Sequence, residues 1–169
     1  FRRVLFRSEV NIERLRNMSR QQGLSAAAHA FNTAILVYAT WAVLPHGPLT
    51  AMGALLELAA AHQLWTWWRH RHRRRPHKVS DRTITRIVAW SVAFGALWGI
   101  LTTGVLSSVS DSKLQLLTYL IILGMGSGAT MMLYPIPAAF AAYLAFTLLP
   151  PWMYVLSLPR HVPSAFHMY

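Results

Sequence analysis

The sequence predicts an all-α, polytopic membrane protein, a bundle of five transmembrane helices. Five hydrophobic segments of about 20 residues are separated by short polar or basic stretches. At 1.5 Å per residue, such a segment covers the roughly 30 Å hydrocarbon core of a bilayer. The composition agrees, because 54% of the 169 residues are hydrophobic and only 12% are charged. Typical soluble domains carry about twice that share of charge.

The ends of the spans are set where apolar runs meet proline or charge. We predict spans at about 24–44, 49–68, 84–106, 114–133 and 138–158. The turn Pro45–Pro48 separates the first two spans, and Tyr134–Pro137 separates the last two. Pro150 and Pro151 lie inside the fifth span and are expected to kink it or end it early, because proline cannot donate the helical hydrogen bond.

The predicted domain organisation is a transmembrane domain at 24–158 with a short segment on either side. Residues 1–23 form a cytoplasmic N-terminal segment, in which 9–20 has the spacing of a short amphipathic helix. Residues 1–8 resemble translated adapter sequence and are left out of the fold prediction. Residues 159–169 are expected on the outer side of the membrane, as a truncated segment that continues in a longer parent chain.

The charge is strongly basic, with 16 Lys and Arg against 5 Asp and Glu. In a soluble protein this balance would suggest nucleic acid, but here the basic residues lie between apolar runs and no nucleic-acid partner is expected. They are suited to anionic lipid headgroups of a bilayer. The headgroup-contacting residues we predict are Arg69, Arg71, Arg73, Arg74, Arg75 and Lys78.

The same residues predict the orientation of the chain. All Lys and Arg except Lys113 and Arg160 fall in the N-terminal segment or between residues 69 and 86. Basic residues of short loops accumulate on the cytoplasmic side. We therefore place the N-terminus and the 69–86 loop in the cytoplasm.

Motifs of soluble enzymes are missing from the sequence. It contains no phosphate-binding glycine loop, no His-Glu-x-x-His motif and no cysteine. We expect no catalytic residue, no cofactor and no enzymatic activity in this chain.

Glu57 is the acidic residue inside a predicted span, where a carboxylate costs roughly 2.5–3.5 kcal/mol on insertion scales. Together with Asn32 in the first span, it is a candidate for ligand binding or protonation. Gly53 and Ala60 share its helical face, which indicates contact with another helix. The alternative is a hydrogen-bonded carboxyl that only helps helices associate.

His29 and His62 are predicted at similar depth below the cytoplasmic surface, on neighbouring helices. Two such histidines are candidates for binding haem or a metal. The simpler interpretation is that both are hydrogen-bonded side chains near the membrane interface, and we expect no metal site.

Glycine pairs four residues apart occur in the third span, Gly95 and Gly99, and in the fourth, Gly124 and Gly128. This spacing lets helix backbones approach closely. Packing within one bundle and a homodimer contact between two chains both fit the pattern.

Motifs of the third to fifth spans resemble those of one class of bacterial proteins. They are ALWG at 96–99, LGMGSGA at 123–129 and LPP at 149–151, with a polar lead-in at 14–25. This set is similar to the N-terminal membrane sensory region of diguanylate cyclases and phosphodiesterases, the GGDEF and EAL proteins, and to regions preceding some sensor histidine kinases. The resemblance covers roughly residues 12–158.

The resemblance implies an even number of spans followed by a cytoplasmic output domain. A sixth helix and a cyclic-di-GMP cyclase or phosphodiesterase domain would then belong to the parent chain. Neither a GGDEF nor an EAL motif occurs here, so no catalytic residue is transferred. We predict a membrane-embedded sensory module. A fragment of a small-solute transporter or channel is the alternative, and a structural anchor is a third option.

Overall fold

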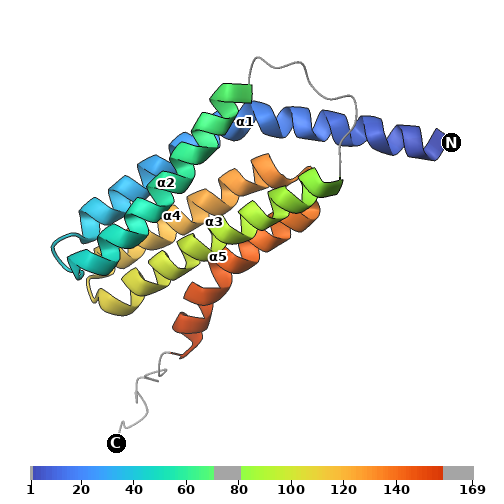
Figure 1. The fold of residues 1–169 in the computed structure, drawn as a ribbon. Helices are drawn as coiled ribbons and strands as arrows, with labels where there is room; N and C mark the ends of the chain where they lie inside the picture. Colours follow the sequence, from blue (N-terminus) through green and yellow to red (C-terminus); the bar gives the residue numbers. More distant parts are fainter. Residues whose placement is uncertain (1, 71–80, 158–169) are drawn as a thin grey trace, which may run out of the picture.

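The computed structural model describes residues 2–70 and 81–157, with side chains placed for 21–69 and 82–157. Within these ranges the chain forms five α-helices and no strand, which confirms the all-α class (Figure 1). The helices are α1 (Arg2–Thr40), α2 (His46–His70), α3 (Asp81–Ser108), α4 (Ser112–Leu133) and α5 (Pro137–Ser157). Consecutive helices run in opposite directions, so that each end of the bundle gathers the beginnings of some helices and the ends of others.

Helix α1 is one continuous element that joins the polar lead-in to the first predicted span. Gly23, at the predicted boundary, lies inside the helix and faces α2. A Cβ at this position would lie 3.0 Å from Trp67 Cε2. The missing side chain thus allows the tryptophan ring to pack on α1, and the N-terminal part of α1 extends beyond the bundle (Figure 1).

Helix α5 continues through Pro150 and Pro151 to Ser157, so these prolines do not end it early. The other expected effect, a kink at the two prolines, stays a prediction. Pro150 cannot donate to the carbonyl of Phe146, four residues back. Gly99 of α3 faces that carbonyl oxygen, which occupies the position that a Cβ on this residue would take. Transmembrane helices tolerate proline where neighbouring groups contact the freed carbonyl in this way.

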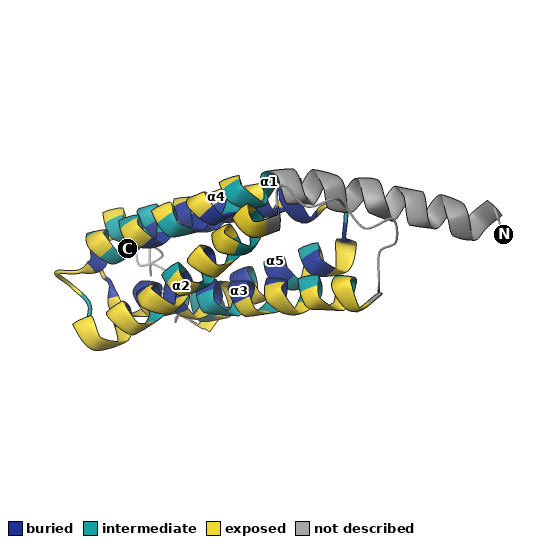
Figure 2. Cartoon of the chain, turned by 45° about the horizontal axis from the view of Figure 1, so that its top comes forward, coloured by how far each residue is buried: buried dark blue, intermediate teal, exposed yellow. Residues whose placement is uncertain are grey.

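The helices pack as two pairs joined by α4. The most extensive contacts are between α3 and α5 and between α1 and α2, while α4 contacts α1, α3 and α5. Contact between α2 and α3 is much smaller. The inner faces carry a continuous apolar core that includes Leu36, Leu56, Trp98 and Val105, each at most 1% exposed (Figure 2).

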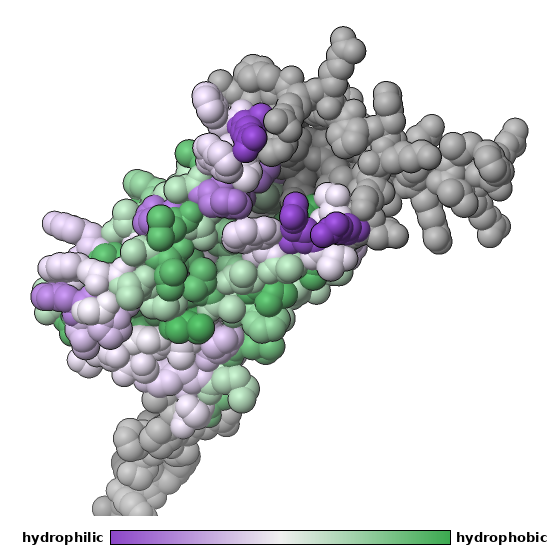
Figure 3. Space-filling view, viewed as in Figure 1, coloured by the Kyte–Doolittle hydropathy of each residue, from purple (hydrophilic) through white to green (hydrophobic). Residues whose placement is uncertain are grey.

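Three helices, α3, α4 and α5, are long and apolar enough to cross a membrane. Most residues in their most apolar stretches are not buried within the chain. Apolar side chains accordingly cover the middle of the face drawn in Figure 3, between more hydrophilic ends. An apolar exposed surface of this kind suits contact with lipid.

The sequence predicted five spans, and three of the five helices meet this criterion of length and apolarity. That the membrane is also crossed by α1 and α2, which do not meet it, stays a prediction. Polar side chains lower their hydropathy: His29 and Asn32 in α1, and Glu57, His62 and Gln63 in α2. Four of these five residues line a cavity described below, with Glu57 as the exception.

Hydroxyl groups along the helices donate to carbonyls one turn back in the same helix. Examples are Thr40 to Leu36 at 2.7 Å and Thr102 to Trp98 at 2.7 Å. Such bonds satisfy serine and threonine without water, as expected for helices in an apolar medium. They occur in α1 and α2 as well as in the three more apolar helices.

Candidate ligand-binding site

A cavity of about 910 Å³ lies among all five helices near one end of the bundle. Its walls come from residues 21–32 of α1, 59–66 of α2, 83–94 of α3, 124–133 of α4 and Tyr143 of α5. Protein cavities that bind small molecules typically measure about 300–1,000 Å³. The volume is therefore sufficient for a drug-sized molecule.

The cavity exists because small residues line helices that stay apart. Ala28, Ala59, Gly124 and Gly128 all face it. A Cβ added at Gly124 or Gly128 would find no atom of another residue within 4 Å. The limited contact between α2 and α3 leaves the space between the two helix pairs unfilled.

His29 occupies the inner end of the cavity and is only 7% exposed. The indole Nε1–H of Trp98 donates to His29 Nδ1 over 2.9 Å. Since Nδ1 accepts, the neutral imidazole carries its proton on Nε2, which is left as a donor. The ring of Phe94 lies 4.7 Å from the His29 ring, centroid to centroid, and holds it from the side.

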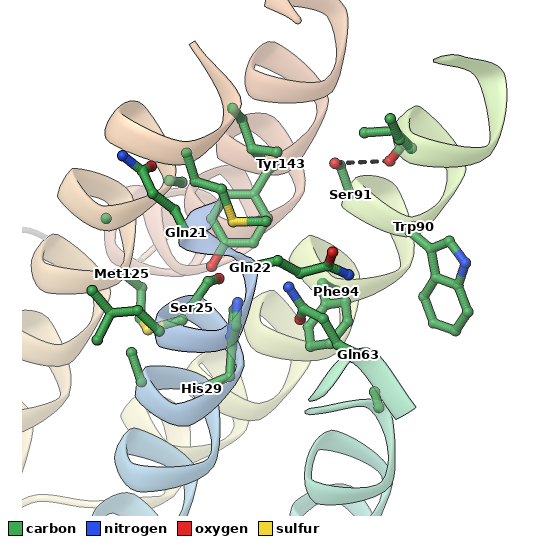
Figure 4. Close-up of a pocket in the computed structure, with 18 of the residues that line it drawn as sticks. Gln21, Gln22, Ser25, His29, Gln63, Trp90, Ser91, Phe94, Met125 and Tyr143 are labelled. Atoms are coloured by element: carbon green, nitrogen blue, oxygen red, sulfur yellow. Dashed lines mark hydrogen bonds between the residues drawn. The ribbon is translucent and has the colours of Figure 1, made fainter. Parts of the chain in front are cut away.

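Tyr143 faces the same inner end, with its ring edge toward His29 at 6.3 Å between centroids. The residue is 3% exposed, and the Thr147 hydroxyl, one turn further along α5, is the partner of its hydroxyl among the described residues. Figure 4 shows His29 and Tyr143 pointing into the cavity from α1 and α5. Gln63, from α2, has a buried side-chain oxygen without a described partner.

Sulfur and aromatic groups form much of the remaining wall. Asn32 donates through Nδ2 to the Sδ of Met125 over 3.0 Å, which links α1 to α4. Across the gap between α2 and α3, the rings of His62 and Trp90 stack with centroids 5.1 Å apart. This stack closes one side of the cavity with flat, polarisable surfaces.

The rim combines apolar and cationic side chains. Leu24 and Met131 are 76% and 75% exposed, and the exposed Arg86 also lines the cavity. No acidic residue is found among the lining residues that the structure describes. The site is therefore neutral inside and positive at its rim.

The predicted histidine pair does line one cavity, but its geometry does not suit a metal or haem. His29 Nδ1 already accepts from Trp98, and its Nε2 carries the proton, so neither nitrogen offers a lone pair. No group of three or more potential metal-binding side chains occurs in the described parts of the chain. His62 is exposed and stacks on Trp90 instead.

Glu57 is half-buried on α2 and does not line the cavity. Its neighbour on the same helical face, Gly53, is buried, and a Cβ there would lie 2.9 Å from Val37 Cγ2. The face that carries Glu57 thus packs toward α1. A ligand or protonation role for Glu57 stays a prediction.

The two glycine pairs have different surroundings. Gly95 and Gly99 are buried at the α3–α5 contact, where a Cβ at Gly95 would lie 2.8 Å from the backbone carbonyl oxygen of Tyr143. Gly124 and Gly128 are exposed and face the cavity, with no helix of this chain packed on them. A homodimer contact through Gly124 and Gly128 stays a prediction.

The arginine-rich segment falls mostly outside the described residues, which applies to Arg71, Arg73, Arg74, Arg75 and Lys78. Arg69, at the end of α2, lies over the ring of Trp65, with Cζ 5.3 Å from the ring centroid. A tryptophan–arginine pair at a helix end is typical of a membrane interface.

Sequence reasoning missed Tyr143 and the hydrogen bond that Trp98 donates to His29. An indole N–H in the middle of an apolar span requires an acceptor when it is buried. That requirement could have directed attention to a partner for Trp98, with His29 as a candidate.

Comparison of the chain with protein-family models, with curated proteins and with solved structures gave no match in any of the three. The functional assignment therefore rests on the cavity and its chemistry.

Proposed function

We propose that this chain is a membrane-embedded sensory module without catalysis of its own. All five helices cross a bacterial inner membrane, with the N-terminus and the 69–86 loop in the cytoplasm. A ligand occupies the interhelical cavity and changes how the α1–α2 pair sits against α3–α5. By its resemblance to membrane sensory regions, the module regulates a cyclic-di-GMP cyclase or phosphodiesterase domain of a parent chain.

The observation that carries this proposal is a cavity built from all five helices at one end of the bundle. A ligand there touches both helix pairs at once, across the weak α2–α3 contact. Its binding free energy can therefore favour one arrangement of the pairs over another. The basic residues between 69 and 86 favour a cytoplasmic location for this end of the bundle.

Packing beyond the cavity supports a sensor over the transporter alternative. Beyond His29 and Phe94, on the side away from the cavity, the interior is filled by Leu36, Leu101 and Val105, each at most 5% exposed. A transporter typically needs broken helices or several polar groups at mid-depth. The described interior at that level is closely packed and mostly apolar.

Filling the cavity should mimic ligand occupancy. Gly128→Leu introduces a side chain into the cavity, since nothing lies within 4 Å of a Cβ there. The matched control is Gly104→Leu on α3, which is equally open but does not line the cavity. The sequence has no cysteine, so spin labels can be attached at Leu64→Cys and Ala89→Cys, exposed positions on α2 and α3.

In lipid nanodiscs, Gly128→Leu is expected to change the α2–α3 label distance by an amount on the order of 1–2 Å, the scale of helix shifts in switching proteins. Gly104→Leu should leave it unchanged. Both variants should insert normally, because leucine is favourable in a bilayer. The sensory proposal is wrong if folded Gly128→Leu gives the same distance distribution as the unmodified chain.

A further inference from the structure

The inner end of the cavity presents hydrogen-bond donors that lack an acceptor. Tyr143 is only 3% exposed, and its hydroxyl lies close to that of Thr147, one turn further along α5. Neither hydroxyl has another partner among the described residues, so even when they pair, one O–H donor has no acceptor. His29 Nε2 carries a proton because Trp98 donates to Nδ1. A buried donor left unpaired costs about as much as a lost hydrogen bond. Both groups therefore favour a ligand with an acceptor oxygen.

The acceptor should be neutral. Two uncharged donors on an apolar floor do not offset the cost of burying a carboxylate or phosphate. The cation Arg86 lies on the rim, eight residues from Phe94 along α3, or about 12 Å at 1.5 Å per residue. A cationic ligand is disfavoured too, because the described lining contains no acidic residue. A carbonyl oxygen meets these conditions.

The walls favour a flat, conjugated body around that carbonyl. Trp90 and Phe94, 6.2 Å apart between ring centroids, border the cavity from α3. Met125 and Met132 face it from α4, and thioethers make favourable contacts with aromatic rings. The exposed apolar rim residues Leu24 and Met131 provide contact for an alkyl tail.

We propose that the cavity binds a neutral, lipophilic carbonyl compound whose oxygen accepts from the Tyr143 hydroxyl and from His29 Nε2–H. The ring-lined walls favour a quinone-type molecule dissolved in the bilayer. The same carbonyl chemistry is also present in the ester groups of membrane lipids, and the experiment below separates the two sources. This inference rests on the proposed function in that it uses the same cavity.

The test measures thermal unfolding of the chain in nanodiscs made from ether lipids, which have no ester carbonyl. A decyl-substituted benzoquinone is titrated in as the probe, because a ligand that binds only the folded state raises the melting temperature. Tyr143→Phe removes only the donor hydroxyl. Tyr119→Phe, on the exposed part of α4 outside the cavity, is the control.

If the source is a quinone, the melting temperature of the unmodified chain and of Tyr119→Phe should rise together. Tyr143→Phe should need roughly fivefold to tenfold more quinone for the same rise, which corresponds to one lost neutral hydrogen bond. Gly128→Leu, which fills the cavity, should abolish the rise. This second variant keeps the test valid if Tyr143→Phe folds poorly.

If the source is a lipid ester, the quinone should have no effect, and ester-lipid nanodiscs should raise the melting temperature relative to ether-lipid ones. Tyr143→Phe and Gly128→Leu should reduce that difference. The carbonyl inference is overturned if neither arm stabilises the chain, or if Tyr143→Phe and Gly128→Leu respond like the unmodified chain. The label distances in Gly128→Leu test the sensory proposal separately, so either idea can fail alone.

Discussion

His29 and Trp98 lie on different helices and satisfy each other inside an apolar bundle. Trp98 is fully buried, and its Nε1–H has His29 Nδ1 as its acceptor at 2.9 Å. In a bilayer no water replaces a missing partner, so the position of each ring depends on the other. The same bond leaves the His29 Nε2–H as a donor at the inner end of the cavity. One contact therefore serves both helix packing and the proposed recognition of a ligand.

Replacing His29 with Leu should therefore destabilise the fold by about 1–3 kcal/mol, the cost of leaving a buried donor without an acceptor. His29→Gln supplies an amide oxygen that can accept from the indole, and should cost less. Free energies of unfolding measured by steric trapping in nanodiscs would compare the two.

A double variant, His29→Leu with Trp98→Phe, controls for lost packing. Because the double variant has neither partner, its cost should be smaller than the sum of the two single costs. Strict additivity would show that the hydrogen bond contributes nothing to stability.

Helices α3 and α5 meet where each carries a residue that disfavours a helix, Gly99 in α3 and Pro150 in α5. Pro150 leaves the Phe146 carbonyl without its usual intrahelical donor, and Gly99 on α3 provides room for that oxygen. A Cα–H group facing a free carbonyl makes a weak favourable contact. Two residues that would weaken an isolated helix thus meet in the most extensive helix–helix contact of the bundle.

Gly99→Ala should accordingly destabilise the protein by about 1–3 kcal/mol, because the new methyl group meets backbone that cannot move aside easily. A Cβ there would also lie 3.1 Å from Pro150 Cγ. On the same helix, Gly104→Ala has open space around it and should be neutral or stabilising by up to about 1 kcal/mol through helix propensity.

Thermal unfolding in a common detergent would rank the two variants of α3. Equal stability of Gly99→Ala and Gly104→Ala would contradict the close-packing account of the α3–α5 contact.

At the scale of the whole molecule, the charges and the cavity coincide at one end. The first residues of α3, with Arg82 and Arg86, and the last residues of α2, with Arg69, lie at the end that holds the cavity. Lys113, at the start of α4, lies at the opposite end. The basic asymmetry therefore predicts a cavity in the cytoplasmic half of the bilayer.

Paired reporters that are active on only one side of the membrane should test this orientation. A fusion after Lys78 is expected to report the cytoplasm, and a fusion after Lys113 the opposite side. Moving basic residues into the 109–111 turn should weaken the preference, since the bias of Lys and Arg sets topology. A periplasmic result after Lys78 with a cytoplasmic result after Lys113 would reverse the proposed membrane placement.

The helical elements were predictable because they follow from local properties of the chain. Hydrophobic length and proline positions located α2 to α5 within a few residues of their observed bounds. Gly23 and Pro150 are residue types that often end a helix, yet the helix continues through both. In both places a neighbouring helix supplies the compensating contact, Trp67 for the first and Gly99 for the second.

The sequence by itself determined the all-α class, the apolar segments, the charge asymmetry and His29 as a polar group within a span. Only the tertiary structure decided that His29 pairs with Trp98, that the hydroxyls of Tyr143 and Thr147 lie together in the interior, and that Gly124 and Gly128 face a cavity. The physical reason is that hydropathy and helix propensity act along the chain. Hydrogen-bond pairing and empty volume depend instead on how helices are rotated and spaced relative to one another.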